Sequence, residues 1–506
     1  MNLRNLIFPP LAKTVYRQYQ RQSAQLIDEQ RKLFYQLFHK IQPTAIGNDL
    51  NLHKLTGYDD YRKNIPIQHY KDLETYILRA SRGEKNMLWP GIPKAIAVTS
   101  GTTSGQKFIP LTTESFKCHR KGRMMAIANY SVKYNQWNHL KGPLLYFTGN
   151  STPIKFGNYD ANLVSSLLFN DVPDWYRRLN LPGEKVAQTL DFSERMTLMI
   201  EEALKNREQL RGIVAFPPWL SHFLDLLEKE TNTSFEELFP NFNLLLTSGM
   251  SFTNYENKIV KQLGQNFDRL ETYPTSEGFI GFTANRNESG FSLLPQNGIF
   301  YEFVKVADLE NEHPQRFWID EVESGVEYAL ILTTNAGLLS YVLGDTVKFI
   351  ELNPHKLIIT GRINRAISTF AEHVTVTDTN NSISNLARQF NLTIAEYCVA
   401  AKPQQQDKKP QYTWIIACKT QPENPESVKH QLNLNLAQEN VLYRSFNKAG
   451  LYEFPEVLFV KEDAFMHYLK TQQGIHFQQK TEHIQLDLTK FDLCYRFMLT
   501  QQHNAF

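Results

Sequence analysis

Cysteine, long apolar runs and net charge are all scarce in this sequence, and each scarcity excludes a class of protein. The 506 residues include four cysteines (Cys118, Cys398, Cys418 and Cys494) with no CxxC pair or Cys/His cluster, which argues against a structural zinc site and a disulfide framework. No apolar run reaches the roughly 18 residues that span a bilayer, so we expect no membrane segment. The formal net charge of +2 gives no electrostatic case for a nucleic-acid or anionic-membrane partner.

What is present is the composition of a globular protein, with 42% hydrophobic and 21% charged residues. A chain of 506 residues exceeds one ordinary core and predicts two domains, or one large domain with a cap. The N-terminal stretch MNLRNLIFPPLAK is a poor signal peptide, because prolines and charges follow its short apolar patch and no small-residue cleavage site occurs. We therefore expect a cytoplasmic monomer with reduced thiols.

Hydrophobic periodicity predicts an α/β protein whose architecture changes along the chain. An amphipathic helix is expected over residues 14–40. Short β-branched segments then alternate with helix-like stretches, which favours a mixed or largely parallel sheet with helical cover. After residue 290 the connections shorten, which favours antiparallel sheet or a distorted barrel. The strand-like segments of the first part are 94–99, 143–148, 212–216 and 243–247, and its helix-like stretches are 112–134, 192–209 and 217–231.

A domain boundary is predicted at TGRINRAIS, residues 360–368. It gives a large N-terminal domain, residues 1–362, and a small C-terminal domain, residues 363–506. In the small domain two apolar segments flank the polar stretch KPQQQDKKPQ at 402–411, which is typical of a solvated hairpin loop or flexible tip.

A loop rich in glycine and hydroxyl groups, at residues 99–108, separates two β-branched runs. It does not fit a Walker phosphate loop, because its glycines are too close, its lysine comes too late, and a strand-like FIPLT follows where a helix is needed. Its glycines still allow backbone N–H groups to converge on an anion. The alternative is an ordinary hydroxyl-rich turn. The residues expected to hold phosphate are Ser100, Gly101, Thr102, Thr103, Ser104, Gly105 and Lys107.

The segment TSGTTSGQKFIPLT resembles the first core motif of adenylate-forming enzymes, which include acyl-CoA synthetases, nonribosomal-peptide adenylation domains and luciferases. Its KFIPLT end resembles one branch, the auxin-responsive (Gretchen Hagen three) family of acyl-acid amido synthetases, of which the chain is identified as a bacterial-type member. Further motifs follow in the family's order over nearly the whole chain. They are TSGMSFTNYE at 247–256, ETYPTSEGFIG at 271–281, LLPQNGIFYEF at 293–303, SYVLGDTVKFI at 340–350 and TGRINRAISTFAEHVT at 360–375.

The resemblance implies a fold and a set of nucleotide contacts. The fold is a large domain of mixed sheets, helices and a distorted β-barrel, followed by a small α+β domain that rotates between two reaction steps. Tyr273 would lie against adenine, Ser276 or Thr275 would reach the α-phosphate, and Glu277 would hold Mg²⁺. A flat ring suits a purine and a hard oxygen suits Mg²⁺. A polar turn after a strand is the alternative for this motif.

Later motifs imply further contacts. Asp345 would accept both ribose hydroxyls, whereas an isolated Gly-Asp pair is usually a hairpin turn. Arg362 would contact the nucleotide or the other domain, and Glu372 matches an acidic position of the branch, with structural ion pairing as the alternative for both. Val342 departs from the family, which has an arginine-like residue after the tyrosine.

The C-terminal segment GIHFQQKTEH resembles the branch's terminal pattern, in which a glutamine and a lysine precede Val-Pro-Arg. Gln478 and Lys480 match this pattern. Thr481, Glu482 and His483 depart from it. The resemblance makes Lys480 the residue that reaches the acyl-adenylate oxygens and neutralises the charge that develops there.

The implied reaction is a ligation that uses ATP and Mg²⁺ and produces AMP. A small-molecule carboxylic acid attacks the α-phosphorus of ATP, which requires positioning and charge stabilisation and no protein nucleophile. The amine of an amino acid then attacks the acyl-adenylate and expels AMP. The acid pocket is expected between residues 112 and 231, including FPPWLSHF at 216–223, where Trp219 and Phe223 line a slot or belong to the core.

Other side chains are weaker candidates. His119 follows the phosphate loop but is expected on the polar face of a helix, and Cys118 has no sign of activation. The spacing of His222, His373 and His483 does not suggest metal ligation.

Three other functions remain open. The chain could be an acyl-CoA ligase with coenzyme A as acceptor, an adenylation domain that loads a carrier protein, or a lapsed acyl- or nucleotide-binding protein. The branch-like segments favour amide formation over the first, and no stretch is left over for a carrier. Val342 and the departures at 481–483 favour the lapsed protein, whereas Lys107, Glu277 and Asp345 argue against it.

Overall fold

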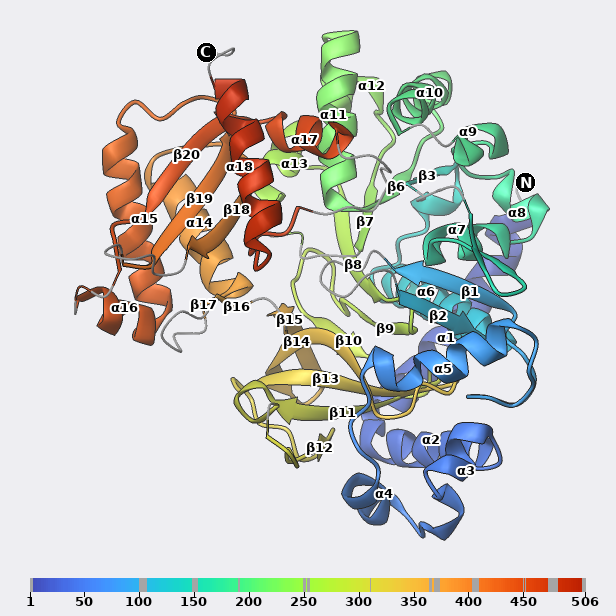
Figure 1. Ribbon diagram of the computed structural model, residues 1–506. Coiled ribbons are helices and arrows are strands. Elements are labelled where there is room, and N and C mark those ends of the chain that lie inside the picture. Colours follow the sequence, from blue (N-terminus) through green and yellow to red (C-terminus); the bar gives the residue numbers. More distant parts are fainter. Residues whose placement is uncertain are drawn as a thin grey trace. The chain divides into compact units, whose positions relative to one another are not determined.

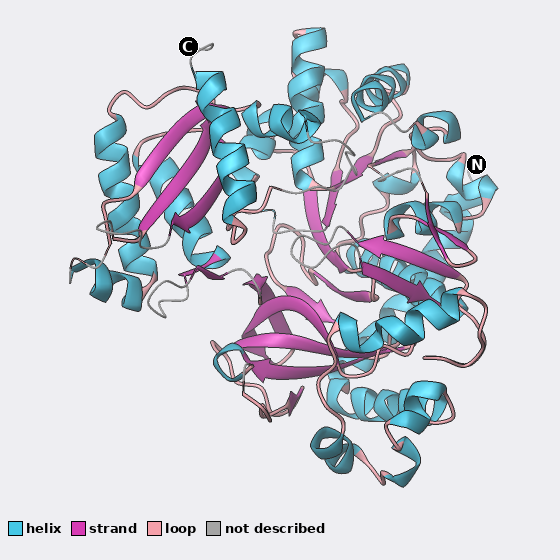
Figure 2. Ribbon diagram, in the orientation of Figure 1, coloured by secondary structure: helices cyan, strands magenta, loops and turns pink. Residues whose placement is uncertain are grey.

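The computed structural model describes residues 3–99, 107–147, 153–189, 192–248, 252, 255–309, 311–363, 366–367, 374–402, 409–448, 450, 452–471 and 481–502. The chain divides into two compact units, a large one within residues 1–359 and a small one within residues 360–506. Both units contain helices and strands (Figure 2), as expected for an α/β protein. No helix among the described residues has the length and apolar character that crossing a membrane requires.

An 11-stranded sheet is the framework of the large unit (Figure 1). From edge to edge its strands are β12 (Phe317–Trp318), β11 (Ile299–Lys305), β13 (Glu327–Thr334), β14 (Tyr341–Leu352), β15 (His355–Arg362), β10 (Phe291–Leu293), β9 (Phe279–Phe282), β8 (Asp268–Pro274), β7 (Leu244–Ser248), β6 (Gly212–Ala215) and β3 (Leu144–Tyr146). β3, β6, β7 and β8 pair in parallel, whereas β8 pairs antiparallel with β9. The sheet therefore changes from parallel to antiparallel pairing, as predicted, and the change begins at β9, slightly before residue 290.

The antiparallel strands curl around a shared apolar cluster. Side chains from β8, β9, β10, β11, β13, β14 and β15 all belong to this cluster, which we call the barrel core. The hydroxyl of Tyr301 on β11 donates to the carbonyl of Ile280 on β9 at 3.0 Å, although these strands are not neighbours in the sheet. The contact across the interior confirms the expected distorted barrel.

Residues 14–40 form parts of two helices, so the prediction of one helix is wrong. α1 (Leu3–Ala24) ends before Gln25, whose φ of −122° and ψ of 32° are not helical, and α2 (Leu26–Ile41) follows. Asp28 and Glu29 lie in the first turn of α2, where acidic side chains stabilise a helix start. The apolar period continues across the break, which is why periodicity alone does not reveal it. The apolar period that predicts this helix comprises six residues, of which Ile27 is only partly buried and the others are buried: Leu26, Leu33, Phe34, Leu37 and Phe38.

Helices lie near the predicted positions elsewhere. α6 (Thr113–Lys133) and α11 (Pro217–Thr231) match their predicted ranges, and α10 (Phe192–Lys205) ends four residues before the predicted limit of 209. α6 begins with a capping box of Thr112 and Ser115. Gly122 lets α6 approach β9, since a Cβ there would come within 2.4 Å of the Phe279 ring. The remaining α-helices of the large unit are α3 (Ala45–Asp49), α4 (Tyr58–Asn64), α5 (Tyr70–Ser81), α7 (Val164–Asn170), α8 (Asp174–Arg177), α9 (Glu184–Gln188), α12 (Phe235–Leu238) and α13 (Glu256–Leu263).

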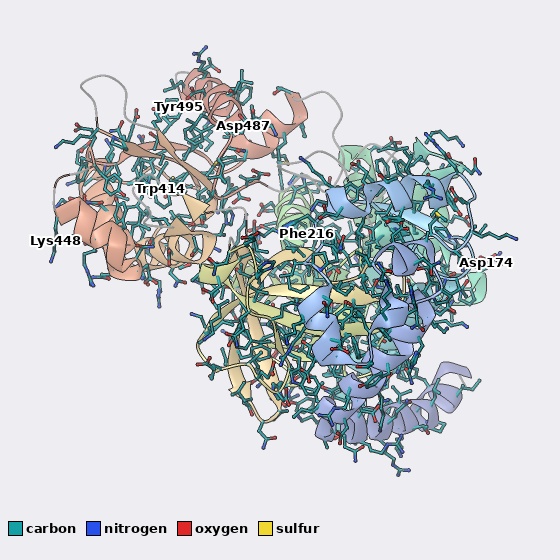
Figure 3. All side chains as sticks on the ribbon, turned by 60° about the horizontal axis from the view of Figure 1, so that its bottom comes forward. Asp174, Phe216, Trp414, Lys448, Asp487 and Tyr495 are labelled. Carbon is teal, nitrogen blue, oxygen red and sulfur yellow. The ribbon has the colours of Figure 1, made fainter. Side chains whose placement is uncertain are left out.

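The small unit has a three-stranded sheet with a core on each face. β18 (Ile394–Lys402) pairs antiparallel with β19 (Gln411–Cys418), as a hairpin requires, and β19 pairs in parallel with β20 (Glu456–Lys461). Trp414, labelled in Figure 3, lies on β19 and contributes to one core, and its neighbour Ile415 contributes to the other. This alternation is expected of a strand covered on both sides. The helices are α14 (Val376–Gln389), α15 (Pro425–Glu439), α16 (Val441–Lys448), α17 (Ala464–Thr471) and α18 (Leu488–Gln502), and β16 (Ala366–Ile367) pairs with β17 (Val374–Thr375).

A buried ion pair joins α4 to the barrel. The guanidinium of Arg316 donates to both carboxylate oxygens of Glu302, at 3.1 and 2.6 Å, and to the carbonyl of Ile65 at 2.6 Å. It also donates to the hydroxyl of Ser340, which bonds the hydroxyl of Tyr61 at 2.7 Å. The side chains of Arg316 and Glu302 are only 4% and 0% exposed, so neither charge is solvated by water.

We predict that Arg316→Met lowers the free energy of unfolding of the large unit by about 3–5 kcal/mol, because it leaves the Glu302 carboxylate buried without a cation. Lys305→Met is the matched control: Lys305 lies on the same strand as Glu302, pairs with Glu323 at 2.8 Å, and both partners are largely exposed. Its loss should be below about 1 kcal/mol. Urea unfolding followed by tryptophan fluorescence measures both, and equal losses would contradict the prediction.

Candidate functional site

The predicted phosphate loop joins the two strands of a hairpin. β1 (Ala95–Thr99) pairs antiparallel with β2 (Lys107–Leu111), and Thr99 lies directly opposite Lys107. Ser100, Gly101, Thr102, Thr103, Ser104 and Gly105 fall outside the described residues. The Phe108 ring stacks on Phe156 with centroids 3.9 Å apart, and the Phe108 N–H donates to the Tyr70 hydroxyl at 3.0 Å. These contacts fix the strand that begins with Lys107, whose phosphate role stays a prediction.

The ETYPTSEGFIG motif, residues 271–281, includes the turn between β8 and β9. The Thr275 N–H donates to the Gly278 carbonyl at 2.8 Å, and the Gly278 N–H donates to the Thr275 hydroxyl at 3.2 Å. Ser276 and Glu277 occupy the tip between them. Ser276 is partly exposed, whereas Glu277 is 7% exposed. The turn is therefore a small, internally bonded unit at the end of a parallel strand, the usual place for a ligand in an α/β sheet.

Two predicted site residues from different motifs touch each other. The hydroxyl of Tyr273 donates to Oδ2 of Asp345 at 2.6 Å. The Tyr273 ring is 4% exposed and lies 5.3 Å from Phe291 in the barrel core. Contact of this ring with adenine stays a prediction. The motif did not predict the hydrogen bond between the Tyr273 hydroxyl and Asp345.

Asp345 lies in a bulge of β14. Val342 pairs with Ile331 and Thr346 pairs with Ala329, so three residues of β14 face one residue of β13. Gly344 has a φ of +97°, a conformation that side chains with a Cβ rarely adopt. A bulge re-aims side chains out of the regular ladder. Val342, the departure from the family pattern, is 7% exposed in the regular part of this strand.

A cluster around Glu271 was missed by the motif analysis. The Phe252 N–H donates to Oε2 of Glu271 at 3.3 Å, and the Arg269 guanidinium lies 4.6 Å from the centre of the Phe252 ring. Arg269 also pairs with Glu256. Burial raises the pKa of the Glu271 carboxyl. The cluster holds Phe252 and Glu256 of the TSGMSFTNYE segment against β8, and the alternation of Arg269 and Glu271 along that strand was its only signal in the sequence.

The remaining predicted residues belong to the small unit. Arg362 ends β15 and is exposed. Glu372, His373, Gln478 and Lys480 fall outside the described residues. Their roles stay predictions.

His483, a departure from the family pattern, lies in a buried network. Its Nδ1 is 2.8 Å from Oδ1 of Asn380, its Nε2 is 2.8 Å from Oε1 of Glu396, and its ring stacks on Tyr397 at 4.2 Å. Both ring nitrogens therefore have an oxygen partner within hydrogen-bond distance. The Val399 N–H donates to the His483 carbonyl at 2.7 Å, so the backbone of this segment is fixed to β18 as well.

His119 is buried and Cys118 is partly buried, so the prediction that His119 lies on a polar helix face is wrong. His119 is 1% exposed, because α6 is covered on more than one side. Burial lowers the pKa of His119 to about 3, so the ring is neutral at physiological pH. Burial also raises the pKa of the Cys118 thiol, which accepts a hydrogen bond from Asn335 at 3.2 Å. Neither environment is that of an activated base or nucleophile.

The expected acid-pocket residues differ in burial. Phe223 is 0% exposed and belongs to a core cluster, whereas Trp219 is partly buried and meets the Phe216 ring edge-on at 5.7 Å. Figure 3 labels Phe216, the residue just before α11. Trp219 therefore stays a candidate for the pocket and Phe223 is a core residue.

The burial of His119 predicts a pH dependence of stability. Its folded pKa of about 3 lies below the ordinary value of 6.5, so below pH 6.5 the unfolded chain takes up a proton that the folded chain does not. Stability from this group is complete above pH 6.5 and is lost as pH falls towards 3. Between pH 8 and 5 the wild type should lose about 2 kcal/mol more than His119→Gln. The exposed His53→Gln should behave as wild type, and identical urea-unfolding curves for all three would contradict the prediction.

The His483 network predicts a local stability effect. His483→Ala removes one hydrogen bond from each of the partly buried oxygens of Asn380 and Glu396, which keep bonds from the hydroxyl and the N–H of Tyr397, and should destabilise β18 by about 1–3 kcal/mol. His467→Ala is the control, because His467 and Asp463 form an exposed pair that should contribute less than about 1 kcal/mol. Native-state hydrogen exchange at the amides of β18 measures both. Unchanged protection in His483→Ala would refute the anchoring role.

Comparison with known proteins places this geometry in one family. The GH3 family N-terminal domain matches residues 15–262, its central domain matches 292–362 and its C-terminal domain matches 377–488. Similar proteins include jasmonoyl–L-amino acid synthetase JAR4 of Nicotiana attenuata, 24% identical, and indole-3-acetic acid-amido synthetase GH3.3 of Arabidopsis thaliana, 21% identical. These alignments cover 57% and 63% of this chain and 60% and 64% of the relatives, so the chain spans about three fifths of their length.

Two solved structures share the fold. AtGH3.15 acyl acid amido synthetase in complex with 2,4-DB has a TM-score of 0.82 at 17% identity, over 97% of this chain and 96% of that one. A 2-hydroxyisobutyryl-CoA ligase in its postadenylation state has a TM-score of 0.59 at 11% identity, over 96% and 92%. The fold is therefore that of adenylate-forming enzymes, and the three domain matches together span most of the sequence. The chain belongs to the GH3 family.

Proposed function

We propose that this chain joins a carboxylic acid to an amino acid through an acyl-adenylate. The carboxylate oxygen attacks the α-phosphorus of ATP, and the bond to the β-phosphate breaks to release pyrophosphate. The amine nitrogen then attacks the acyl carbon, the bond to AMP breaks, and the amine proton leaves to solvent. The names of the GH3 relatives, which join jasmonic or indole-3-acetic acid to an amino acid, support this class of reaction.

The observation that carries the proposal is the bond between Tyr273 and Asp345. These residues are 72 positions apart and come from two separate motifs, which the family resemblance relates to adenine and to ribose. Their contact is what a single nucleoside site requires. Glu277 and Ser276 follow Tyr273 on the same turn, so a phosphate chain that leaves the ribose would meet them next.

The roles of the other residues follow from charge. Lys107 would neutralise charge on the departing pyrophosphate, together with the loop from Ser100 to Gly105. Lys480 would do the same at the acyl-adenylate oxygens. Preorganised charges of this kind supply much of the catalysis in phosphoryl and acyl transfer.

A single protein carboxylate suits the proposed Mg²⁺. Among the described residues there is no group of three His, Cys, Asp or Glu side chains that could form a metal cage. Mg²⁺ in nucleotide enzymes is commonly held by one or two carboxylates together with substrate phosphates. Glu277, at the tip of the turn, would be that carboxylate.

We also propose that the small unit acts as a mobile C-terminal domain after residue 362 and that the protein works as a cytoplasmic monomer. Rotation of this domain would let Arg362 and Lys480 serve one half-reaction and leave the site open for the second. Such gating separates steps that need different surroundings.

The test is pyrophosphate release from Mg·ATP over a panel of carboxylic acids, with and without mixed amino acids, and in parallel with coenzyme A. We expect release that depends on one acid, and an amide with AMP by mass spectrometry. Lys107→Ala should lower this release about 100-fold. Asp345→Ala should raise the ATP concentration for half-maximal rate about tenfold. Lys348→Ala, a charge removal on the same strand as Asp345, should change neither by more than about twofold.

Other outcomes would contradict the proposal. Release that requires coenzyme A would assign the chain to the acyl-CoA ligases, whose fold it shares. ATP binding without release for any acid would assign it to non-catalytic acyl- or nucleotide-binding proteins. Unchanged ATP affinity in both Lys107→Ala and Asp345→Ala would refute the proposed site.

A further inference from the structure

We propose that the hydroxyl of Tyr273 is a positioning group, which holds the Asp345 carboxylate in the orientation that accepts the two ribose hydroxyls. This inference rests on the proposed function, in which Asp345 binds ribose. It gives the hydroxyl of Tyr273 a task separate from any contact between its ring and adenine.

Asp345 needs such a partner because of where it lies. The bulge of β14 removes it from the regular ladder, and Gly344 beside it has a positive φ of +97°. Its side chain is only partly buried. A partly exposed aspartate in a bulge can rotate about both of its side-chain bonds, and freezing such rotation on ligand binding costs affinity.

The bond to Tyr273 removes this freedom and leaves acceptor capacity for a ligand. The 2.6 Å distance is that of a short hydrogen bond to a charged acceptor. A carboxylate offers about four acceptor positions. The phenol uses one of them, on Oδ2, and does not by itself block a bidentate contact with a diol.

Tyr273 is rigid enough to act as a fixed donor. It lies on β8, which is paired on one side with β7 and on the other with β9, where Tyr273 is opposite Gly281. A Cβ on Gly281 would come within 2.5 Å of the Ser292 carbonyl, so β9 and β10 are closely packed beside the tyrosine. With its ring in the barrel core, Tyr273 has little rotational freedom left to lose.

The test compares ATP with 2′,3′-dideoxy-ATP, which lacks both ribose hydroxyls, as Mg²⁺ complexes measured by calorimetry. Tyr273→Phe keeps the ring and removes only the hydroxyl. We expect it to weaken ATP binding about five- to tenfold and to change dideoxy-ATP binding less than twofold. In Asp345→Ala the preference for ATP should disappear, and adding Tyr273→Phe to it should cause no further loss.

Tyr301→Phe is the matched control. Tyr301 is also a buried tyrosine of the barrel core, but its hydroxyl donates to the backbone carbonyl of Ile280. Its loss should leave the affinities for both nucleotides within twofold of wild type. A general effect of removing a buried hydroxyl would appear in both variants and for both nucleotides.

The failure of this inference is distinguishable from the failure of the proposed function. If the wild type prefers ATP and Tyr273→Phe keeps the full preference, or weakens both nucleotides equally, the positioning role is refuted while the ribose site stands. If the wild type binds both nucleotides equally, the ribose assignment of Asp345 is itself wrong, and the proposed site falls with it.

Discussion

The curl of the antiparallel strands is the constraint on which the candidate site depends. β8 and β14 are separated in the sheet by β9, β10 and β15. In a flat sheet four strand spacings would place them about 19 Å apart, far beyond the reach of a tyrosine and an aspartate. The barrel core draws the strands into a closed curve, and Tyr273 and Asp345 meet across it. The apolar packing of the barrel is thus what assembles polar residues from distant motifs.

The barrel core also explains why the site is polar only at its rim. Tyr301, Phe303 and Leu330 fill the interior and leave no room there for a ligand. Polar side chains therefore collect where strands end or bulge, at the turn with Glu277 and at Asp345. In a regular strand the side chains alternate between the two faces of the sheet, and the bulge beside Gly344 interrupts this alternation at Asp345.

Much of the fold could be predicted from local patterns. β6 lies within the predicted segment 212–216, α11 has the predicted bounds of 217–231, and Thr112 with Ser115 gives α6 a recognisable start. The apolar periodicity of the local sequence and the helix caps determine where such elements form. The break at Gln25 could not be predicted, because the period is unchanged across it, and the burial of His119 depends on how other elements cover α6.

The site was predictable as a set of residues and much less as an arrangement. The motifs supplied Tyr273, Glu277 and Asp345, since each stands in a short recognisable pattern. The bond between Tyr273 and Asp345 requires the bulge, the strand order and the curl, none of which is encoded near either residue. His483 stands where the family has an arginine, and its hydrogen-bond contacts with Asn380 and Glu396 depend on neighbouring elements that the motif does not contain.

The buried pair of Arg316 and Glu302 restricts how this part of the sequence can evolve. Loss of either partner strands the other charge, whereas replacement of both by apolar residues of similar volume can be neutral. Replacement of this pair by apolar residues, one residue at a time, therefore passes through a single variant that folds poorly. Because Tyr61 and Ser340 share this network through their side chains, substitution at either of these positions is restricted as well, whereas Ile65 contributes only its backbone carbonyl.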